Sequence, residues 1–118
     1  MNGSEQASFG FLKCGEVRRL NDDLRQTGVG GRFMVTSGIA ALPCASVAAV
    51  MAAVQSFDAF DPGNDPYCEH DFGSVDVDGH QVFWKIDYYD RTLSSASPNP
   101  ADPHCTTRVL TVMLAEEY

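Results

Sequence analysis

The sequence predicts a single small α+β domain, in which two helices pack on one face of an antiparallel sheet of three to four strands. A chain of 118 residues with 44% hydrophobic content suits one hydrophobic core and is short for two domains. Two segments in the first half show helical spacing of apolar residues, and the second half holds a hairpin signal flanked by alternating residues. We therefore expect one domain over residues 11–118, preceded by a polar, disordered segment over residues 1–10.

The first helix is expected over residues 15–26. Val17, Leu20 and Leu24 recur there at helical spacing, and charged residues fill the other faces. This pattern is typical of a surface helix with one narrow apolar stripe. The second helix, expected from Pro43 onward, carries valines at a period of 3.6 with alanines between them, so it is suited to close packing on a sheet.

The hairpin is centred on Asp78 and Gly79, the favoured pair for a two-residue type I′ turn because both positions need a positive φ. Such a turn sets Gly73 opposite Trp84, so that the indole covers a residue without a side chain. One face of the hairpin is then apolar and belongs to the core, whereas the other is polar and acidic.

Two further strands complete the expected sheet. Residues 33–36 combine β-branched and aromatic side chains, which a pleated surface favours. Residues 106–118 fit either a strand or a helix, and we expect a strand because a two-stranded hairpin needs a third partner. Residues 92–103 hold three prolines without apolar periodicity, which indicates a loop.

Acidic residues concentrate in the middle of the chain. Between residues 58 and 90, nine carboxylates stand against one base, Lys85, so this segment carries a charge of −8, equal to the formal net charge of the whole chain. We call these nine residues the central carboxylates: Asp58, Asp61, Asp65, Glu69, Asp71, Asp76, Asp78, Asp87 and Asp90. Nucleic-acid phosphates and anionic membranes attract clustered lysine and arginine, so the expected partner is a basic protein surface, without direct nucleic-acid or membrane contact.

A cytoplasmic location is expected from two features of the sequence. No apolar run approaches the length of a membrane span, and the N-terminal residues have neither a basic n-region nor an apolar h-region. The four cysteines are widely spaced without a Cys-x-x-Cys pair, so we expect free thiols in a reducing compartment.

The central segment also holds residue types that occur in metal and acid–base sites. Glu69, His70 and Asp71 are consecutive, and His80 follows. Their spacing matches no known ligand pattern, and loops of this composition often use such side chains for capping and turns. The sequence therefore assigns no catalytic residue, metal ligand or cofactor, and a small metal-dependent hydrolase using this cluster is the alternative function.

Aromatic residues near the hairpin indicate a possible interface. Tyr88 and Tyr89 are neighbours on an expected strand, so one ring points inward and the other outward. An outward tyrosine beside carboxylates suits a protein interface, although a half-buried sheet residue is the favoured interpretation. A homodimeric scaffold that uses Trp84, Tyr88 or Tyr89 is thus a further alternative.

Several long motifs resemble one known family. The segments LNDDLR, NDPYCEHDFG, FWKIDYYD and RVLTVMLAEEY are similar to the bacterial domain of unknown function 3768 family, over about residues 16–118. In that family the position of Cys68 is more often glycine, which argues against Cys68 as a shared nucleophile or ligand. The resemblance implies no established activity, but it does imply an association with plasmids, phages and integrated elements.

That association and the acidic segment together indicate a function. Small acidic proteins of mobile elements often act against host defence, so we expect a non-enzymatic inhibitor of a nucleic-acid-directed defence complex, anti-CRISPR-like or antirestriction-like. The central carboxylates, together with Tyr89, would contact the partner and could imitate the charge of a nucleic-acid backbone. This function requires that folding gathers them on one exposed patch; the alternative is a solvated acidic face that aids solubility.

Overall fold

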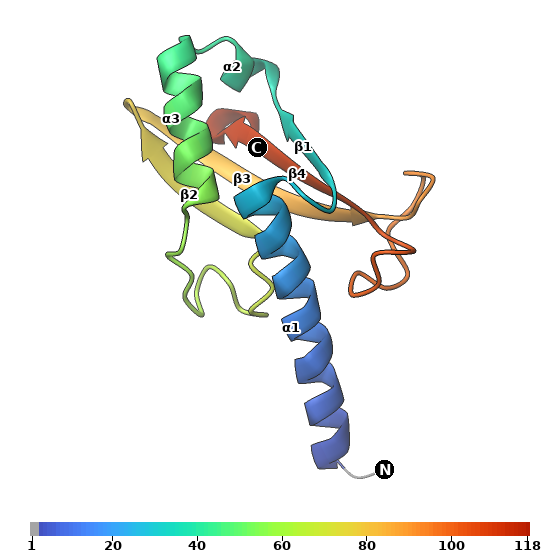
Figure 1. Ribbon diagram of the computed structural model, residues 1–118. Coiled ribbons are helices and arrows are strands. Elements are labelled where there is room, and N and C mark those ends of the chain that lie inside the picture. The colour runs from blue at the N-terminus through green and yellow to red at the C-terminus, as the bar shows by residue number, and fades with distance from the viewer. Residues whose placement is uncertain (1–2) are drawn as a thin grey trace.

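The computed structural model describes residues 3–118, with side chains from Gly15 onward. Its elements follow in the order α1 (Gly3–Thr27), β1 (Arg32–Val35), α2 (Ser37–Ala40), α3 (Cys44–Gln55), β2 (Phe72–Val77), β3 (His80–Tyr89), β4 (Thr107–Leu114) and the 3-10 helix η1 (Ala115–Glu117). Figure 1 shows them as one α+β domain, with the first half of α1 extending beyond the sheet.

The four strands form one mixed sheet in the order β1-β4-β3-β2. The β2–β3 and β3–β4 pairs are antiparallel, as predicted, but β1 runs parallel to β4. This difference has a topological cause, because β1 and β4 are joined through α2, α3 and the hairpin rather than by a tight turn. The C-terminal element is a strand, which confirms the choice made between strand and helix.

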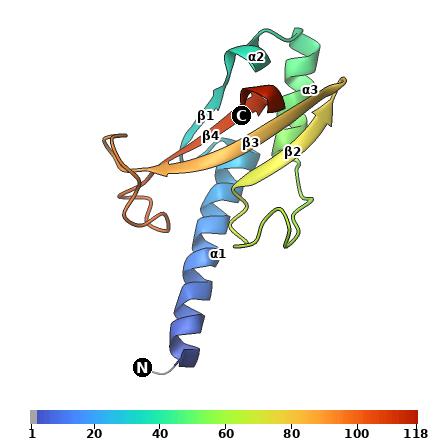
Figure 2. The ribbon, with the colours of Figure 1, turned by 180° about the vertical axis from the view of Figure 1, so that it is seen from behind.

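The helices cover one face of the sheet, which confirms the predicted layer arrangement. In Figure 1, α3 lies in front of the strands, and the last turns of α1 reach the sheet near the lower end of α3; Figure 2 shows the sheet from behind, in front of the helices. The core between the two layers consists of Leu24, Ile39, Val50, Val54, Val82, Trp84, Ile86, Leu110 and Val112. The structure also has a third, short helix, α2, which lies between β1 and α3 in the sequence and contributes Ile39 to this core.

The hairpin has the register that its turn predicts. Asp78 and Gly79 have φ values of 51° and 81°, as a type I′ turn requires. Gly73 pairs with Trp84, and a Cβ atom built on Gly73 would lie 2.4 Å from the indole Nε1. The glycine is therefore needed at this position so that the buried indole can lie flat on the strand.

The side of the sheet opposite the helices is the outer face. The alternation of the paired strands places on it Arg32, Met34, Asp76, Phe83, Lys85, Asp87, Tyr89, Val109, Thr111 and Met113. The end of the chain folds over part of this face, where the Tyr118 ring packs edge-on against Phe72 and Phe83. Strand residues of the outer face are otherwise left without a covering layer of helix (Figure 2).

The ends and thiols of the chain complete the description. α1 begins at Gly3, earlier than the expected start at residue 15. Disorder over residues 1–10 stays a prediction, and residues 1 and 2 lie outside the described part of the chain. Cys44, Cys68 and Cys105 are free thiols. Within residues 3–118, we find no helix with the length and apolar character that crossing a bilayer requires.

Candidate functional site

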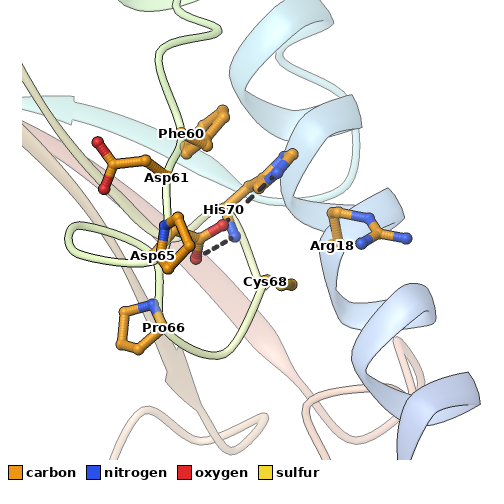
Figure 3. Close-up of a pocket in the computed structure, with 8 residues that line it drawn as sticks. Arg18, Phe60, Asp61, Asp65, Pro66, Cys68 and His70 are labelled. Atoms are coloured by element: carbon orange, nitrogen blue, oxygen red, sulfur yellow. Dashed lines mark hydrogen bonds and ion pairs between the residues drawn. The ribbon is translucent and has the colours of Figure 1, made fainter.

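The loop between α3 and β2 folds back against α1 and forms the most elaborate polar region of the described chain (Figure 3). Two aspartates shape it. One oxygen of Asp61 accepts hydrogen bonds from the backbone N–H groups of Gly63 and Asn64, at 2.8 and 2.9 Å. The buried Asp65 accepts from the N–H groups of Glu69 and His70, at 3.1 and 3.2 Å. Both carboxylates thus act as backbone acceptors within the loop.

His70 is fixed between this loop and α1. Its ring stacks on Phe60 with the centroids 3.7 Å apart and the planes 3° from parallel. Its Nδ1 lies 2.9 Å from an oxygen of Asp22 on α1, and its Nε2 lies 3.6 Å from an oxygen of Asp65. Both ring nitrogens therefore face carboxylates, which leaves neither free to activate a nucleophile in this arrangement.

Arg25 connects α1 to the C-terminal end of α3. Its guanidinium is buried and donates to the carbonyl oxygens of Val54, Gln55 and Phe57, at 3.2, 3.2 and 2.8 Å. It also forms an ion pair with Asp22, at 3.1 Å. The last carbonyls of a helix lack intrahelical partners, so this arginine supplies the donors that the end of α3 requires.

Asn21 and Arg108 join α1 to the sheet. The buried Asn21 amide donates to the Glu69 carbonyl oxygen at 2.9 Å and to the Tyr88 hydroxyl at 2.8 Å. Its oxygen accepts from Nε of the buried Arg108, at 2.9 Å, and Arg108 also donates to the Pro100 carbonyl. Each buried polar group here has a partner from another element, as burial demands.

Two carboxyl groups meet at the Tyr88 hydroxyl. Asp71 and Glu69 place oxygens 3.3 and 3.4 Å from it. Burial raises the pKa of both carboxyls, and the negative charges of neighbouring carboxylates add to the effect, whereas the Tyr88 hydroxyl lowers both pKa values. Burial, together with the charge of Asp71, also raises the pKa of Tyr88. The hydroxyl therefore stays protonated and serves as a donor to this pair.

A cavity of about 240 Å³ opens between α1 and the loop. It is lined by Arg18, Phe60, Asp61, Pro62, Asp65, Pro66, Cys68 and His70 (Figure 3). Its volume is below the usual 300–1,000 Å³ of small-molecule sites. Its carboxylates and its imidazole are already engaged in holding the loop, so the cavity as it stands has the character of a structural junction.

The central carboxylates of the loop divide between the surface and this junction. Asp65 is buried, and Glu69 and Asp71 are half-buried against Tyr88. Asp58 and Asp61 are exposed on the same loop. The structure therefore brings part of the predicted partner-binding set together, but it uses Asp65, Glu69 and Asp71 for internal contacts.

The remaining central carboxylates lie along the hairpin. Asp76 and Asp87 are on the outer face, where Asp87 forms an ion pair of 3.0 Å with Lys85. Asp78 is in the turn before β3 and Asp90 directly follows this strand, so the ten residues of β3, spanning ~33 Å, lie between them. The central carboxylates are thus distributed over several surfaces and do not form the single patch that the expected function requires.

The other candidate residues are also separated. His80 starts β3 beside the turn, eight positions before Tyr88, and this distance of ~26 Å along the strand keeps it away from Glu69 and Asp71. The four-residue cluster proposed for metal binding therefore does not assemble. Trp84 is fully buried in the core, and Tyr88 points into the junction with α1, so of the three aromatic candidates for an interface only Tyr89 is exposed.

Sequence reasoning missed the polar residues that build the junction, namely Asn21, Asp22, Arg25 and Arg108. A signal for the first and third was present, because Asn21 and Arg25 fall on the same helical face as the buried Val17 and Leu24. Because these two side chains are buried, the buried face of α1 is wider than the apolar stripe expected for this helix. Arg108 and Asn21 are 87 positions apart in the sequence, so no local sequence pattern predicts that they pair.

The fold and this junction define a class of small α+β proteins in which one helix is tied by buried polar side chains to a loop and to two central strands. The protein belongs to the family described as "Protein of unknown function (DUF3768)", whose model matches residues 35–117. The match covers α2, α3, the carboxylate-rich loop and strands β2 to β4, with only the last residue of β1. It confirms the family indicated by the sequence motifs, although the LNDDLR segment of α1 lies outside the matched range. No curated protein and no solved structure matches the chain.

Proposed function

We propose that this protein is a non-enzymatic acidic binding protein that docks on a basic protein surface. The partner would be a nucleic-acid-directed defence complex of a bacterial host, inhibited in an anti-CRISPR-like or antirestriction-like manner in the cytoplasm. Because the central carboxylates as a set do not form the single patch expected, the proposal is narrowed to the members left at the surface. The observation that carries it is the excess of these surface carboxylates over bases in residues 58–90, where Lys85 is the single basic residue.

Arg19 and Arg25 of α1 pair with acids of their own helix and not with the central carboxylates, whereas Arg18 lines the cavity that Asp61 and Asp65 also line. Arg19 pairs with Glu16 and Asp23 of its own helix, and Arg25 pairs with Asp22. Among the described side chains, the ion pairs that involve central carboxylates are those of Asp65 with His70 and of Asp87 with Lys85. The exposed members of the set therefore remain available to a basic partner.

The outer face supplies the docking area for such a partner. It lacks a helical cover, and it presents Asp76, Asp87 and the exposed ring of Tyr89. The same face also carries the bases Lys85, paired with Asp87, and Arg32 at its β1 edge. Tyrosine contributes contact area at low entropic cost, and carboxylates around it steer a basic surface into place. Asp78 and Asp90 lie just before and just after β3, whereas Asp58 and Asp61 lie on the loop between α3 and β2.

The spacing of the carboxylates favours docking over imitation of a duplex. Asp76 pairs with Gln81, and Asp87 is six positions further along β3, so the two acids of the outer face lie ~20 Å apart. Double-stranded DNA carries one charge per ~1.7 Å of its axis. The protein would therefore act by electrostatic complementarity to a basic groove, and nucleic-acid mimicry is the narrower form of the proposal.

The host setting of the proposal comes from the family resemblance. The resemblance implies an association with plasmids, phages and integrated elements, and products of such elements would gain from blocking host nucleases. Bacterial origin and a mobile-element context are part of the proposal, as is the identity of the partner.

Phage plating tests this function directly. Cells with an active CRISPR or restriction system should be plated with phage in the presence and absence of the protein, and we expect the protein to restore plaque formation by at least about tenfold. The double charge reversal Asp76→Lys and Asp87→Lys should abolish this effect, because it changes the charge of the outer face. Reversal of two exposed acids outside the central segment, Asp23→Lys and Glu116→Lys, changes the net charge equally and should retain it. Equal plating with the two double variants, or no rescue by the wild type in either kind of host, would argue against the proposal.

A small hydrolase is the second candidate. The observation in its favour is the meeting of Glu69 and Asp71 at Tyr88, with burial raising the pKa of both carboxyls, since such carboxyls serve as general acids. His80 has no part in this version, and no group of metal-ligating side chains occurs among the described residues. Elemental analysis of the purified protein is the discriminating measurement, because a stoichiometric transition metal would favour the enzyme.

A homodimeric scaffold through Tyr89 would appear as a dimer by gel filtration.

A further inference from the structure

A second cavity, of about 380 Å³, lies on the outer face, on the opposite side of the sheet from the polar junction. It is lined by Arg32, Met34, Tyr89, Leu93, Val109 and Thr111. Strands β1 and β4 form its base, since Arg32 pairs with Val109 and Met34 with Thr111. Its volume falls within the usual 300–1,000 Å³ of small-molecule sites.

Exposed apolar side chains converge on this cavity. Met34, Leu93 and Tyr89 are 52%, 40% and 36% exposed, and all three belong to its lining. Val109 at its base is 8% exposed. Three large apolar residues of the described surface thus surround one hollow. Exposed apolar residues that cluster in this way indicate a binding site, whereas singly scattered ones do not.

Leu93 is held in a strained conformation to take its place there. Its φ of 61° lies in the left-handed region, which costs a leucine free energy and persists only where surrounding contacts impose it. The turn supplies those contacts: the N–H of Leu93 donates to the Asp90 carbonyl at 3.1 Å, and an Asp90 carboxylate oxygen accepts from the N–H groups of Thr92 and Ser94 at 3.2 and 3.0 Å. Strain that serves to display an apolar side chain at the surface indicates a function.

Arg32 supplies the one charge of the lining. Among the described residues, none forms an ion pair with its guanidinium, and its backbone is fixed by pairing with β4. Asp90, the acid of the adjoining turn, accepts from the backbone N–H groups that shape the turn. Asp87, which is in register with Arg32 through Val109, pairs with Lys85. A single arginine beside an apolar hollow is complementary to an anion that carries an apolar body, because guanidinium matches the geometry of a carboxylate.

We propose that this cavity binds a small apolar carboxylate. The anion pairs with Arg32, and the hydrocarbon chain lies among Met34, Tyr89 and Leu93 and displaces water from their surfaces. The argument for this site rests on the cavity, on Arg32 and on the turn, and does not require the docking function, although the cavity shares Tyr89 and the outer face with the proposed docking area.

Titration of the full chain with octanoate, below its micelle concentration, tests the proposal. The Met34 and Leu93 methyl groups, followed by NMR, should show saturable shifts with octanoate. Octanol, which has the same chain without the charge, should bind at least about tenfold more weakly, which corresponds to ~1.4 kcal/mol. Equal affinity for the two compounds, or no saturable shift up to about 10 mM octanoate, would overturn the proposal.

Two variants and one control locate the site. Arg32→Gln should weaken octanoate about tenfold and leave octanol unchanged, whereas Arg91→Gln, an exposed arginine outside the lining, should leave both unchanged. Leu93→Gly should weaken both ligands without lowering the Tm, because glycine adopts the positive φ without strain. Retention of wild-type octanoate affinity by Arg32→Gln would overturn the assignment of the anion to Arg32.

Discussion

Two arginines of α1 illustrate how burial changes the contribution of an ion pair to the stability of the fold. The Arg25 side chain is 1% exposed and donates to three carbonyls and to Asp22, whereas the Arg19 side chain is 58% exposed and pairs with Glu16 and Asp23. We expect Arg25→Met to lower the free energy of unfolding by about 3 kcal/mol, because it leaves buried acceptors without donors. Arg19→Met should cost less than ~1 kcal/mol. Urea denaturation of the two variants provides the comparison, and equal losses would contradict the role assigned to Arg25.

Glu69 and Asp71 predict a pH dependence of stability. Burial raises the pKa of both, so the folded protein retains their protons to a higher pH than the unfolded chain does. Their stabilising contribution is fully present below the ordinary carboxyl pKa of ~4 and is lost as the pH rises through the raised values. We expect Glu69→Gln with Asp71→Asn to gain stability relative to the wild type as the pH increases from about 4 to 8, measured by urea denaturation at each pH.

Tyr88→Phe is the control, because it should increase the pH dependence of stability that the double variant reduces. The hydroxyl lowers the pKa of Glu69 and of Asp71, so its removal should raise both pKa values further. The loss of stability with rising pH should then be steeper than in the wild type. A pH profile that neither variant changes would show that these carboxyls titrate alike in the folded and unfolded states.

Sequence reasoning at the residue scale found the acids but not the side chains that bury them. Asn21, Arg25 and Arg108 are polar, so their types favour solvent exposure, yet all three are buried. Their burial depends on partners in distant segments, such as the carbonyls of α3 for Arg25. Such nonlocal hydrogen bonding leaves no pattern within a window of one helix.

At the scale of elements, the hairpin was the part most fully determined by local chemistry. The turn at Asp78 and Gly79 sets the register, and the register sets which side chains reach the core. The parallel pairing of β1 with β4 had no comparable signal, since the two strands are distant in sequence and β1 has only four residues. The predicted antiparallel sheet was therefore right for two of its three pairings and wrong for the β1–β4 edge.

Gly73 offers a direct test of the packing between β2 and β3. A methyl group there would overlap the indole of Trp84, so Gly73→Ala should destabilise the protein by ~1–3 kcal/mol. Ser74→Ala, at the exposed neighbouring position, should change stability by less than ~0.5 kcal/mol. Fluorescence of the single tryptophan during urea denaturation reports both, and a neutral Gly73→Ala would mean that the indole does not lie on this strand.

At the scale of the whole molecule, the acidic segment serves two purposes. Asp65 holds the loop together, and Glu69 and Asp71 contact Tyr88 of β3, whereas the exposed acids are free to meet a partner. The sequence predicted that the negative charge lies in residues 58–90. It could not predict which of these carboxylates are buried and which are exposed, because burial depends on where α1 packs. The proposal of a docking surface accordingly rests on the exposed members alone.

The central claim is that these exposed acids bind a basic partner, and the salt dependence of that binding tests it most directly. The Kd for the purified defence complex whose inhibition is seen in plating should be measured between about 50 and 300 mM NaCl. We predict that binding weakens at least about tenfold over this range and that Asp76→Lys with Asp87→Lys removes the dependence along with most of the affinity. A Kd that is constant across the range, and unchanged by the double reversal, would contradict the account.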